Sequence, residues 1–459
     1  AAASDVYKRQ MNNFDYDLIV IGAGSGGTRT ARIAAGYGAK TAVIEGDRPG
    51  GTCVLRGCVP KKLLIYGSEF SHQVEDAIGY GWETSSFKSN WENLISKKNK
   101  ELDRLHEIYK KLIINSGCDL IPGWGKVVSA HEVLVKNESS KERKISAKKI
   151  MIAVGGKSSF PDFDGNLNMI NSDEALDLKE LPKSILIYGS GYIAVEFAGI
   201  FNGFGVETNL VFRSDFVLRG FDIDIRKKLT EQIENRGIKV FSRATIEKIE
   251  GSDQFVAHLS NGKKILSDKV MGATGRIPNI ETLGLNEIGL KTGKQGNIIV
   301  NEFNQTNIES IYAIGDVTDR INLTPVAIAE GHAFSDREFG NKNRFISYDN
   351  VPSAVFSQPP VSVVGLTLED AKTLNIKAKE FVSEFNPLKN TITGKQEKTL
   401  MKLVVDENDK VLGAHMLGDY SPEIIQGIAV SIKAGAKKSD FDATIGIHPT
   451  AAEEFVTMK

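Results

Sequence analysis

Two stretches of this chain follow the same plan, and the repeat constrains the fold more than any other feature. Tyr16–Val20 is an apolar run that leads into a glycine-rich turn, a helix-like segment and a second apolar run ending at Glu45. Ser184–Tyr188 opens a second copy, whose last apolar run ends at Phe212. Each copy predicts a strand–helix–strand unit of the kind that binds dinucleotides. The sequence therefore predicts an α/β protein with two nucleotide-binding domains.

The pattern changes beyond about residue 340. Strands with the sequences MKLVVD and VLGAHML precede a helical stretch, EIIQGIAVSIKAGA, and no glycine fingerprint accompanies them. We expect a separate α+β module there. Residues 94–117 are rich in Lys, Glu and Leu at helical spacing and predict a long exposed helix. A chain of 459 residues is too long for one core and has room for roughly two to four domains.

Composition narrows the class of protein. The 57 basic and 58 acidic residues leave a formal net charge of −1, which gives no electrostatic reason to expect a nucleic-acid or membrane partner. No apolar run has the length of a spanning helix. Residues 1–10, AAASDVYKRQ, have neither an apolar core nor a cleavage pattern, and we interpret them as a foreign or unstructured extension. Without a targeting signal, the expected location is the cytoplasm.

The first glycine-rich turn is a candidate phosphate site. Its predicted contacts are Gly22, Gly24, Ser25, Gly26 and Gly27. Glycines let the backbone approach a pyrophosphate, and the following helix offers unpaired N–H groups. Glu45 follows Gly22 by 23 residues, where a carboxylate would accept hydrogen bonds from a ribose diol. The alternative is a glycine-rich turn with a surface glutamate.

A downstream segment favours FAD at this first site. Ser310–Val317, SIYAIGDV, is an apolar strand that ends in Gly315 and Asp316. It resembles the motif of flavoprotein reductases in which the aspartate holds the ribityl chain of FAD. Alone, an aspartate at a strand end would mean little, but it follows a dinucleotide fingerprint in the same chain.

The second turn favours NADPH. Its predicted contacts are Gly189, Ser190, Gly191, Ile193 and Ala194. Phe212 stands where the first copy has Glu45, and Arg213 and Arg219 follow. A carboxylate would repel a 2′-phosphate, whereas two guanidiniums would bind it by charge-assisted hydrogen bonds. The alternative is a pair of solvated surface arginines.

The segment GGTCVLRGCVPKK, residues 50–62, contains two of the three cysteines, Cys53 and Cys58. A zinc site would need two further soft ligands, and only Cys118 remains. A structural disulfide is unusual in a reducing compartment. A redox-active pair fits best, at a helix N-terminus where a cation and the helix lower the thiol pKa values. Cys118 is expected to be a small buried residue.

This segment resembles the active-site segment of the glutathione reductases, in the class I pyridine nucleotide–disulfide oxidoreductase family, and the match runs from Met11 to Lys459. The resemblance implies that Cys58 faces the flavin and that Cys53 attacks the substrate disulfide. It also implies that Lys61 lies by the flavin and pairs with Glu196, and that Tyr192 gates the nicotinamide pocket. Further residues assigned to cofactor binding on this basis are Thr52, Gly125, Gly275, Arg276 and Thr324.

The C-terminal segment HPTAAEE resembles a further signature of the family. Expulsion of a thiolate from a disulfide calls for a proton near neutral pH, and an imidazole oriented by a carboxylate can supply it. The resemblance implies that His448 is this acid/base, that Glu453 orients it, and that the histidine acts in the active site of the partner subunit of a homodimer.

Substrate choice rests on four residues. Arg29 and Arg32 lie three apart on one predicted helix face, where they would attract the glycine carboxylates of glutathione disulfide. Tyr109 matches the family tyrosine over the glutathione site. His332 stands where many glutathione reductases have an arginine, which weakens one expected carboxylate contact, and Arg29 is the residue that can compensate. One alternative is that both arginines are solvated helix charges; another is that the substrate is a different low-molecular-weight disulfide, lipoamide- or trypanothione-like.

The predicted architecture is α/β, with two Rossmann-like dinucleotide-binding domains, for FAD and NADPH, and a C-terminal α+β dimerisation domain. The FAD domain is expected over residues 11–157 with a return segment over 281–345, the NADPH domain over 158–280, and the dimerisation domain over 346–459. No metal is expected. A flavin-binding redox-sensing scaffold without turnover is the rival from another class, although it would need neither Lys61 nor His448.

Overall fold

The computed structural model describes residues 14–83, 86–137 and 139–459. The expected extension over residues 1–10 lies outside these described residues. The chain forms two compact units. The first consists of the described part of residues 1–60 together with 96–158 and 276–347, and the second consists of the described part of 61–95 together with 159–275 and 348–459.

The first unit is built on a seven-stranded sheet in the order β3-β2-β1-β6-β5-β4, with β16 beside β6. The strands β1, β2, β3, β6 and β16 run parallel, whereas β4 and β5 join β6 as an antiparallel ribbon. The strand bounds are β1 Tyr16–Ile21, β2 Thr41–Glu45, β3 Asp119–Pro122, β4 Trp124–Val127, β5 Glu132–Lys136, β6 Glu142–Ile152 and β16 Ile311–Ala313. A short antiparallel pair, β7 Gly156–Ser158 with β15 Arg276–Pro278, completes the unit.

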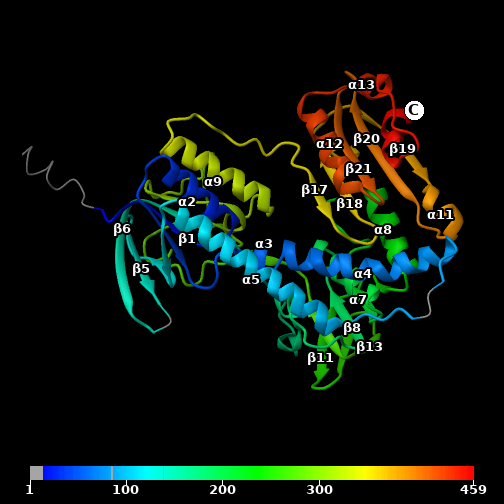
Figure 1. The fold of residues 1–459 in the computed structure, drawn as a ribbon, viewed down its shortest axis with the longest axis horizontal. Coiled ribbons are helices and arrows are strands. Elements are labelled where there is room, and N and C mark those ends of the chain that lie inside the picture. The colour runs from blue at the N-terminus through cyan, green and yellow to red at the C-terminus, as the bar shows by residue number, and fades with distance from the viewer. Residues whose placement is uncertain (1–13, 84–85, 138) are drawn as a thin grey trace, which may run out of the picture. The chain divides into compact units, whose positions relative to one another are not determined.

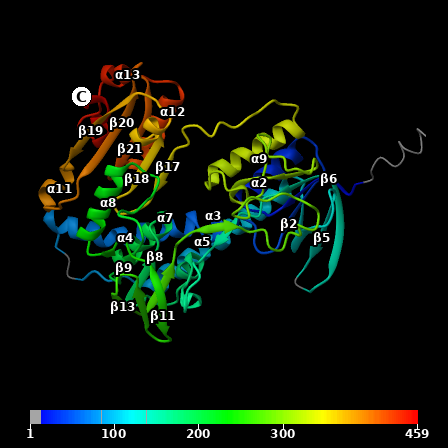
Figure 2. The same cartoon turned by 180° about the vertical axis from the view of Figure 1, so that it is seen from behind.

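Strand β1 shows why this sheet lies between two layers. Leu18 and Val20 pack into one hydrophobic cluster, while Ile19 and Ile21 pack into another on the opposite face. Because side chains alternate along a strand, burial of both sets requires cover on both faces. Two helices, α2 Ser25–Gly36 and α9 Thr324–Glu338, contact each other and lie side by side in both views (Figures 1 and 2).

The second unit contains a parallel sheet in the order β10-β9-β8-β14 and an antiparallel sheet in the order β11-β12-β13. The strands are β8 Ser184–Tyr188, β9 Glu207–Val211, β10 Lys239–Phe241, β11 Ile246–Gly251, β12 Phe255–Leu259, β13 Lys264–Ser267 and β14 Lys269–Gly272. The expected strand ending at Phe212 stops one residue earlier, although Phe212 is only 1% exposed.

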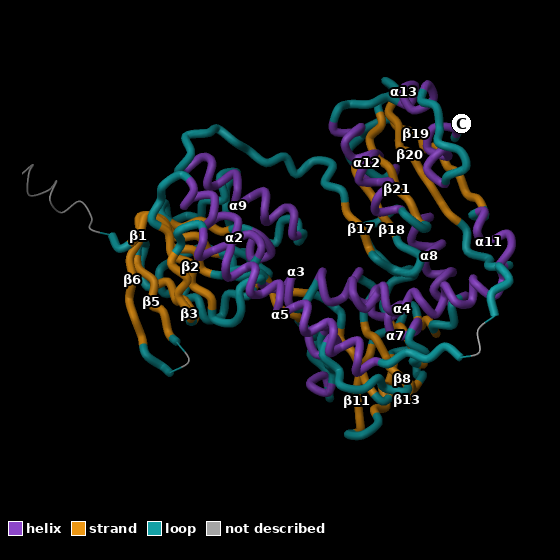
Figure 3. Tube along the Cα trace, in the orientation of Figure 1, coloured by secondary structure: helices purple, strands orange, loops and turns teal. Residues whose placement is uncertain are grey.

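The C-terminal part of this unit is an antiparallel sheet in the order β17-β18-β21-β20-β19. Helix α12, Ser421–Lys433, contacts β18 and β21, and Figure 3 shows it beside these strands. The strands are β17 Ser353–Val355, β18 Val361–Gly365, β19 Ala378–Phe385, β20 Thr399–Asp406 and β21 Val411–Leu417. The predicted fold class, with two dinucleotide-binding sheets and a C-terminal α+β module, is confirmed.

The long helices α4, Cys58–Gly79, and α5, Trp91–Asn115, contain residues of both units. Helix α5 starts three residues before its expected position because Asn90 Oδ1 accepts a hydrogen bond from the N–H of Asn93 at 2.9 Å, as an N-cap does. The remaining helices are α3 Gly51–Leu55, α6 Ser172–Leu176, α7 Tyr192–Gly203, α8 Ile223–Asn235, α10 Leu368–Thr373, α11 Leu388–Thr393, α13 Lys438–Ala443 and α14 Glu454–Thr457. Within the described ranges, no helix is both long and apolar enough to cross a membrane.

Candidate active site

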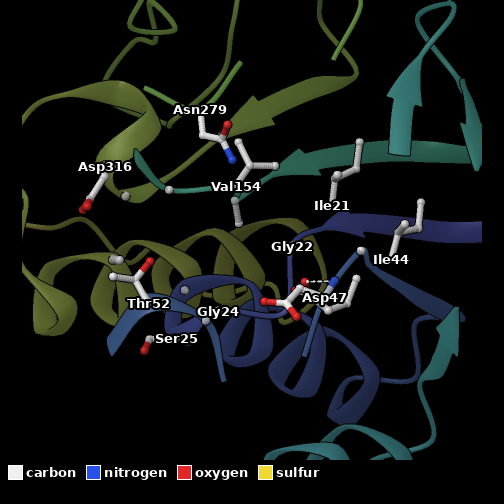
Figure 4. A pocket seen from close by; sticks show the side chains of 18 of the residues that line it. Ile21, Gly22, Gly24, Ser25, Ile44, Asp47, Thr52, Val154, Asn279 and Asp316 are labelled. Carbon is white, nitrogen blue, oxygen red and sulfur yellow. Dashed lines mark hydrogen bonds between the residues drawn. The ribbon is translucent and has the colours of Figure 1, made fainter. Parts of the chain in front are cut away.

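A cleft of about 1110 Å³, part of it open to solvent, lies in the first unit where β1, β2 and β6 end. Figure 4 shows Ser25, Thr52 and Asp316 toward one end of the view and Ile21 and Ile44 toward the other. Predicted cofactor residues that line this cleft are Gly22, Gly24, Ser25, Gly26, Glu45, Thr52, Gly125, Asp316 and Thr324.

The glycine turn after β1 needs its glycines for steric reasons. Gly22 has φ +104°, and a Cβ there would stand 2.4 Å from the carbonyl oxygen of Ala153. A Cβ on Gly27 would stand 1.9 Å from the carbonyl oxygen of Gly22, so this glycine allows α2 to pack against the turn rather than lining the cleft. At Gly24, by contrast, the nearest atom is 3.8 Å away. The backbone at the start of α2 therefore lies open to a ligand, at a helix end where N–H groups favour an anion.

Glu45 ends β2 with both carboxylate oxygens fixed. Its Oε2 accepts a hydrogen bond from the N–H of Ala23 at 2.6 Å, and its Oε1 accepts one from the N–H of Asp47 at 2.9 Å. Burial raises the pKa of Glu45, against the lowering effect of these two donors. The carboxylate is thus held at the cleft wall, where remaining lone pairs can accept from ribose hydroxyls.

Asp316 follows β16 and faces the same cleft (Figure 4). Burial raises its pKa, while Arg276 lowers it. The preceding N–H of Gly315 donates to Glu330 Oε2 at 2.7 Å, which anchors this turn on α9. The cleft thus combines an open helix N-terminus with hydroxyl-binding carboxylates on separate strand ends. This donor set fits a dinucleotide, whose phosphates lie between polyhydroxylated arms.

The two cysteines lie beside this cleft as thiols. Cys53 is in α3, and Cys58 is the first residue of α4, with its Sγ 3.7 Å from Thr324 Oγ1. A hydrogen bond with Cys58 raises the pKa of Cys53, and burial adds to the shift. The expected lowering of the thiol pKa values is therefore not found for Cys53 in this dithiol form, because its hydrogen bond with Cys58 favours the protonated thiol. Cys118 is buried, as expected.

The second glycine turn, in the other unit, has the same steric requirement for glycine as the first. Gly189 has φ +146°, and a Cβ there would stand 2.2 Å from the carbonyl oxygen of Ala273. Gly191 caps α7 and has no atom within 4 Å of a Cβ position. Arg213 and Arg219 are exposed. In the described part of the chain neither guanidinium forms a hydrogen bond or ion pair, so both are available to an anion.

The other residues predicted for cofactor binding have more varied surroundings. The carbonyl of Ser190 accepts a hydrogen bond from the N–H of Leu218 at 2.7 Å, and Ile193 and Ala194 lie in the first turn of α7. Gly275 accepts from the N–H of Ser159 at 3.0 Å. The Arg276 guanidinium donates to the carbonyl of Gly156 and is not among the residues lining the first cleft.

Lys61 and Glu196 form an ion pair in the second unit. Lys61 Nζ lies 2.5 Å from Glu196 Oε1, and the same oxygen accepts from the N–H of Phe356 at 3.0 Å. The Glu196 side chain is 2% exposed, so its charge needs these partners. The Lys61 ammonium also lies 5.9 Å from the ring centroid of Tyr192, which starts α7 and is 44% exposed.

His448 and Glu453 also contact each other. His448 Nδ1 lies 3.1 Å from both carboxylate oxygens of Glu453, which orients the ring and leaves Nε2 directed elsewhere. The His448 side chain is 82% exposed. An imidazole held by a carboxylate but open on its other nitrogen is arranged for proton transfer.

The four predicted substrate residues lie in the first unit. Burial raises the pKa of Tyr109, and the nearby Cys53 adds to this shift. Arg29 and Arg32 lie near enough to the same hydroxyl to lower its pKa by smaller amounts. Arg32 Nε is buried without a hydrogen-bond partner among the described residues. His332 Nε2 lies 3.6 Å from Asp336 Oδ1. Burial lowers the pKa of His332, and Arg344 and Arg29 add to the shift.

The sequence interpretation missed several residues of the cleft. Trp124, the first residue of β4, is 56% exposed, and a Cβ on Gly46 would lie 2.3–2.6 Å from three atoms of its indole. Asn279 reaches the cleft from the loop after β15 (Figure 4). Asp47 and Arg56, which form an ion pair, also line it. Asp47 follows Glu45 by two residues and Arg56 lies between the two cysteines, so both stand beside a predicted site residue in the sequence.

Comparison with known proteins gives consistent results. The model of the pyridine nucleotide-disulphide oxidoreductase family matches residues 16–331, and the model of that family's dimerisation domain matches residues 351–459. A glutathione reductase from Nostoc sp. is 47% identical over 97% of this chain and 100% of its own length. The chloroplastic/mitochondrial glutathione reductase of Pisum sativum is 48% identical over 97% of this chain and 82% of its own. A trypanothione reductase from Trypanosoma congolense is 40% identical over 97% of this chain and 95% of its own.

Proposed function

Because the chain belongs to the pyridine nucleotide-disulphide oxidoreductase family, we propose that it is a homodimeric enzyme that reduces glutathione disulfide with NADPH and FAD. The observation that carries this proposal is the pair of thiols beside a cleft whose hydrogen-bonding groups fit a dinucleotide: Cys53 lines the cleft, and Cys58 Sγ lies 3.7 Å from Oγ1 of Thr324, another lining residue. We propose the domain limits given above for its parts. We also propose the cytoplasm as its location.

FAD would be held in the first cleft. Glu45 would accept from its adenosine ribose, the N-terminus of α2 would bind its pyrophosphate, and Asp316 would accept from its ribityl chain. Bound there, FAD supplies the transfer of reducing equivalents from NADPH to the Cys53–Cys58 disulfide. The resemblance to glutathione reductases further implies that Lys61, paired with Glu196, would lie at the flavin and that Tyr192 would gate the nicotinamide pocket.

The cysteines would then carry out two disulfide exchanges. The Cys53 thiolate attacks one sulfur of glutathione disulfide, which forms a mixed disulfide and expels one glutathione thiolate. His448, oriented by Glu453, donates a proton to that thiolate. Cys58 then attacks the sulfur of Cys53, restores the internal disulfide and releases the second glutathione. We propose that His448 acts in the partner subunit, and its 82% exposure in the single chain supports this.

Labelling of the thiols tests the proposed function directly. Anaerobic treatment of the oxidised enzyme with NADPH, followed by iodoacetamide and mass spectrometry, is expected to label Cys53 or Cys58. Cys118 is 5% exposed and is expected to stay unlabelled with or without NADPH, which provides an internal control. Labelling of the Cys53–Cys58 segment to the same extent without NADPH would contradict a redox cycle and favour the flavin-binding scaffold.

The arginine pair makes a prediction about coenzyme choice. Replacing both Arg213 and Arg219 by glutamine is expected to raise KM for NADPH by about 10- to 100-fold, since each guanidinium offers charge-assisted hydrogen bonds to a 2′-phosphate. KM for NADH, which lacks that phosphate, should change little. Steady-state kinetics with both coenzymes measures the ratio. An unchanged preference for NADPH over NADH would mean that other residues bind the 2′-phosphate.

His332 makes a prediction about pH. Since burial lowers its pKa, the ring is neutral at pH 7 and gains charge only as the pH falls. Glutathione carboxylates stay ionised above about pH 4. KM for glutathione disulfide is therefore expected to fall only as the pH drops below about 6.5, the ordinary histidine pKa, and by at most roughly two- to fivefold, the effect of a partly exposed ion pair. His332→Gln should remove this pH dependence, and an identical profile in that variant would exclude His332 from the substrate site.

A further inference from the structure

A buried lysine in the C-terminal sheet has no role in the chemistry described above. Lys402 lies in β20, where the residues Thr399–Val405 are all buried, and its side chain is 1% exposed. Its Nζ lies 2.9 Å from Asp222 Oδ2, 2.7 Å from Asp224 Oδ2 and 2.8 Å from Glu380 Oε2. A buried ammonium is stable only with such partners.

The three carboxylates converge closely enough to hold a metal ion. The Lys402 ammonium already contacts all three, which gives the cluster a resident cation. Burial alone would lower the pKa of Lys402, but hydrogen bonds to Asp224, Glu380 and Asp222 outweigh it and raise the pKa. The lysine is thus charged, and the cluster is a cross-link between elements rather than a metal site.

The cross-link joins β19 and β20 of the C-terminal sheet to the N-terminus of α8. Asp222 is the N-cap of α8, where its Oδ1 accepts from the N–H groups of Asp224 at 3.0 Å and Ile225 at 3.2 Å. Its other oxygen, Oδ2, binds Lys402. One side chain therefore both starts the helix and attaches it to the neighbouring sheet.

Helix α8 in turn holds the loop that carries Arg213 and Arg219. Arg226 Nε donates to the carbonyl of Val217 at 2.9 Å, and Thr230 Oγ1 accepts from the N–H of Val217 at 3.2 Å. On its other side the loop is bound to the second glycine turn through Leu218 N–H and the Ser190 carbonyl. The position of the two guanidiniums relative to that turn therefore depends on where α8 begins.

We propose that Lys402 is a positioning residue for recognition of the NADPH 2′-phosphate: by holding Asp222 and Asp224, it fixes the loop of Arg213 and Arg219. The inference rests on the proposed use of NADPH by this site. It links coenzyme affinity to a buried residue of the C-terminal module that acts through the carboxylates of Asp222 and Asp224.

Binding of adenosine 2′,5′-bisphosphate to the holoenzyme, measured by calorimetry, tests the proposal without turnover. Lys402→Met is expected to weaken this ligand by about tenfold, while 5′-AMP, which lacks the 2′-phosphate, binds as before. Glu380→Gln removes one partner of the ammonium without changing α8, and a two- to threefold weakening is expected. Lys438→Met is the matched control, since Lys438 is also 3% exposed and ion-paired but contacts Asp442 and Met458.

Each outcome decides between alternatives. A Lys402→Met protein that melts at a lower temperature but binds the bisphosphate normally would overturn the proposal and leave Lys402 a purely structural residue. Should this variant fail to fold, Glu380→Gln decides by the same criterion. Equal weakening in Lys438→Met would attribute the effect to general destabilisation and also overturn it. Failure of the unsubstituted enzyme to bind the bisphosphate would instead refute the proposed use of NADPH.

Discussion

Replacing Cys53 by serine is expected to reduce turnover of glutathione disulfide by roughly three orders of magnitude or more, because a hydroxyl cannot form the mixed disulfide. The glycine turn, Glu45 and Asp316 remain in this variant, so FAD should stay bound. NADPH should still bleach the flavin absorbance, which separates loss of the attacking thiol from loss of the cofactor.

The matched control is Cys118→Ala. Cys118 is buried, its Sγ lies 3.5 Å from the carbonyl of Ala31, and it is not among the residues that line the cleft. Its removal should leave kcat within about twofold of the parent. Turnover by Cys53→Ser at a rate close to that of the parent would refute the assignment of Cys53 as the attacking thiol, and loss of activity in Cys118→Ala would call the whole cysteine assignment into question.

His448→Ala is expected to lower kcat by about 10²- to 10⁴-fold, the usual contribution of a positioned proton donor. Reduction of the bound flavin by NADPH should proceed at the parental rate, because no proton has to reach a glutathione thiolate in that step. Glu453→Gln, which keeps a hydrogen-bond acceptor at Nδ1 but removes the charge, should have a smaller effect in the same direction. Stopped-flow measurement of flavin reduction alongside steady-state kcat distinguishes the two steps.

A mixed dimer shows which subunit supplies His448. Differently tagged Cys53→Ser and His448→Ala chains, each inactive alone, are co-expressed and the mixed dimer is isolated. If His448 acts in the partner, one of the two sites combines an intact cysteine pair with an intact histidine, and about half of the parental activity returns. An inactive mixed dimer would place His448 in the site of its own chain.

The glycine turns and the strands around them could be predicted from the sequence because their geometry depends on neighbouring residues. The turns after β1 and β8 need glycine at Gly22 and Gly189, where φ is positive and a Cβ would meet a backbone oxygen, and these steric demands leave a recognisable spacing. The same holds for β2, which ends at Glu45 as expected. The C-terminal strands and helix also followed from their apolar periodicity.

Contacts between distant segments left no such pattern. Trp124 and Asn279 reach the first cleft from separate loops, and nothing in their neighbouring residues marks them. Lys402 lies in the expected strand MKLVVD, and nothing near it in the sequence marks it; yet Thr399–Val405 are all buried, and its ammonium contacts carboxylates 22 to 180 positions away. The raised pKa of Cys53 likewise depends on the placement of the Cys58 thiol, which spacing alone does not specify.

Oxidation of NADPH by the purified holoenzyme, followed at 340 nm with a series of disulfide acceptors, is the most direct test of the central claim. The account predicts rapid oxidation with glutathione disulfide, with kcat/KM at least about a hundredfold above that for lipoamide or trypanothione disulfide. It also predicts little oxidation without an acceptor. Preference for trypanothione disulfide or lipoamide would contradict the substrate assignment, and no acceptor-dependent oxidation with any disulfide would contradict the enzyme itself.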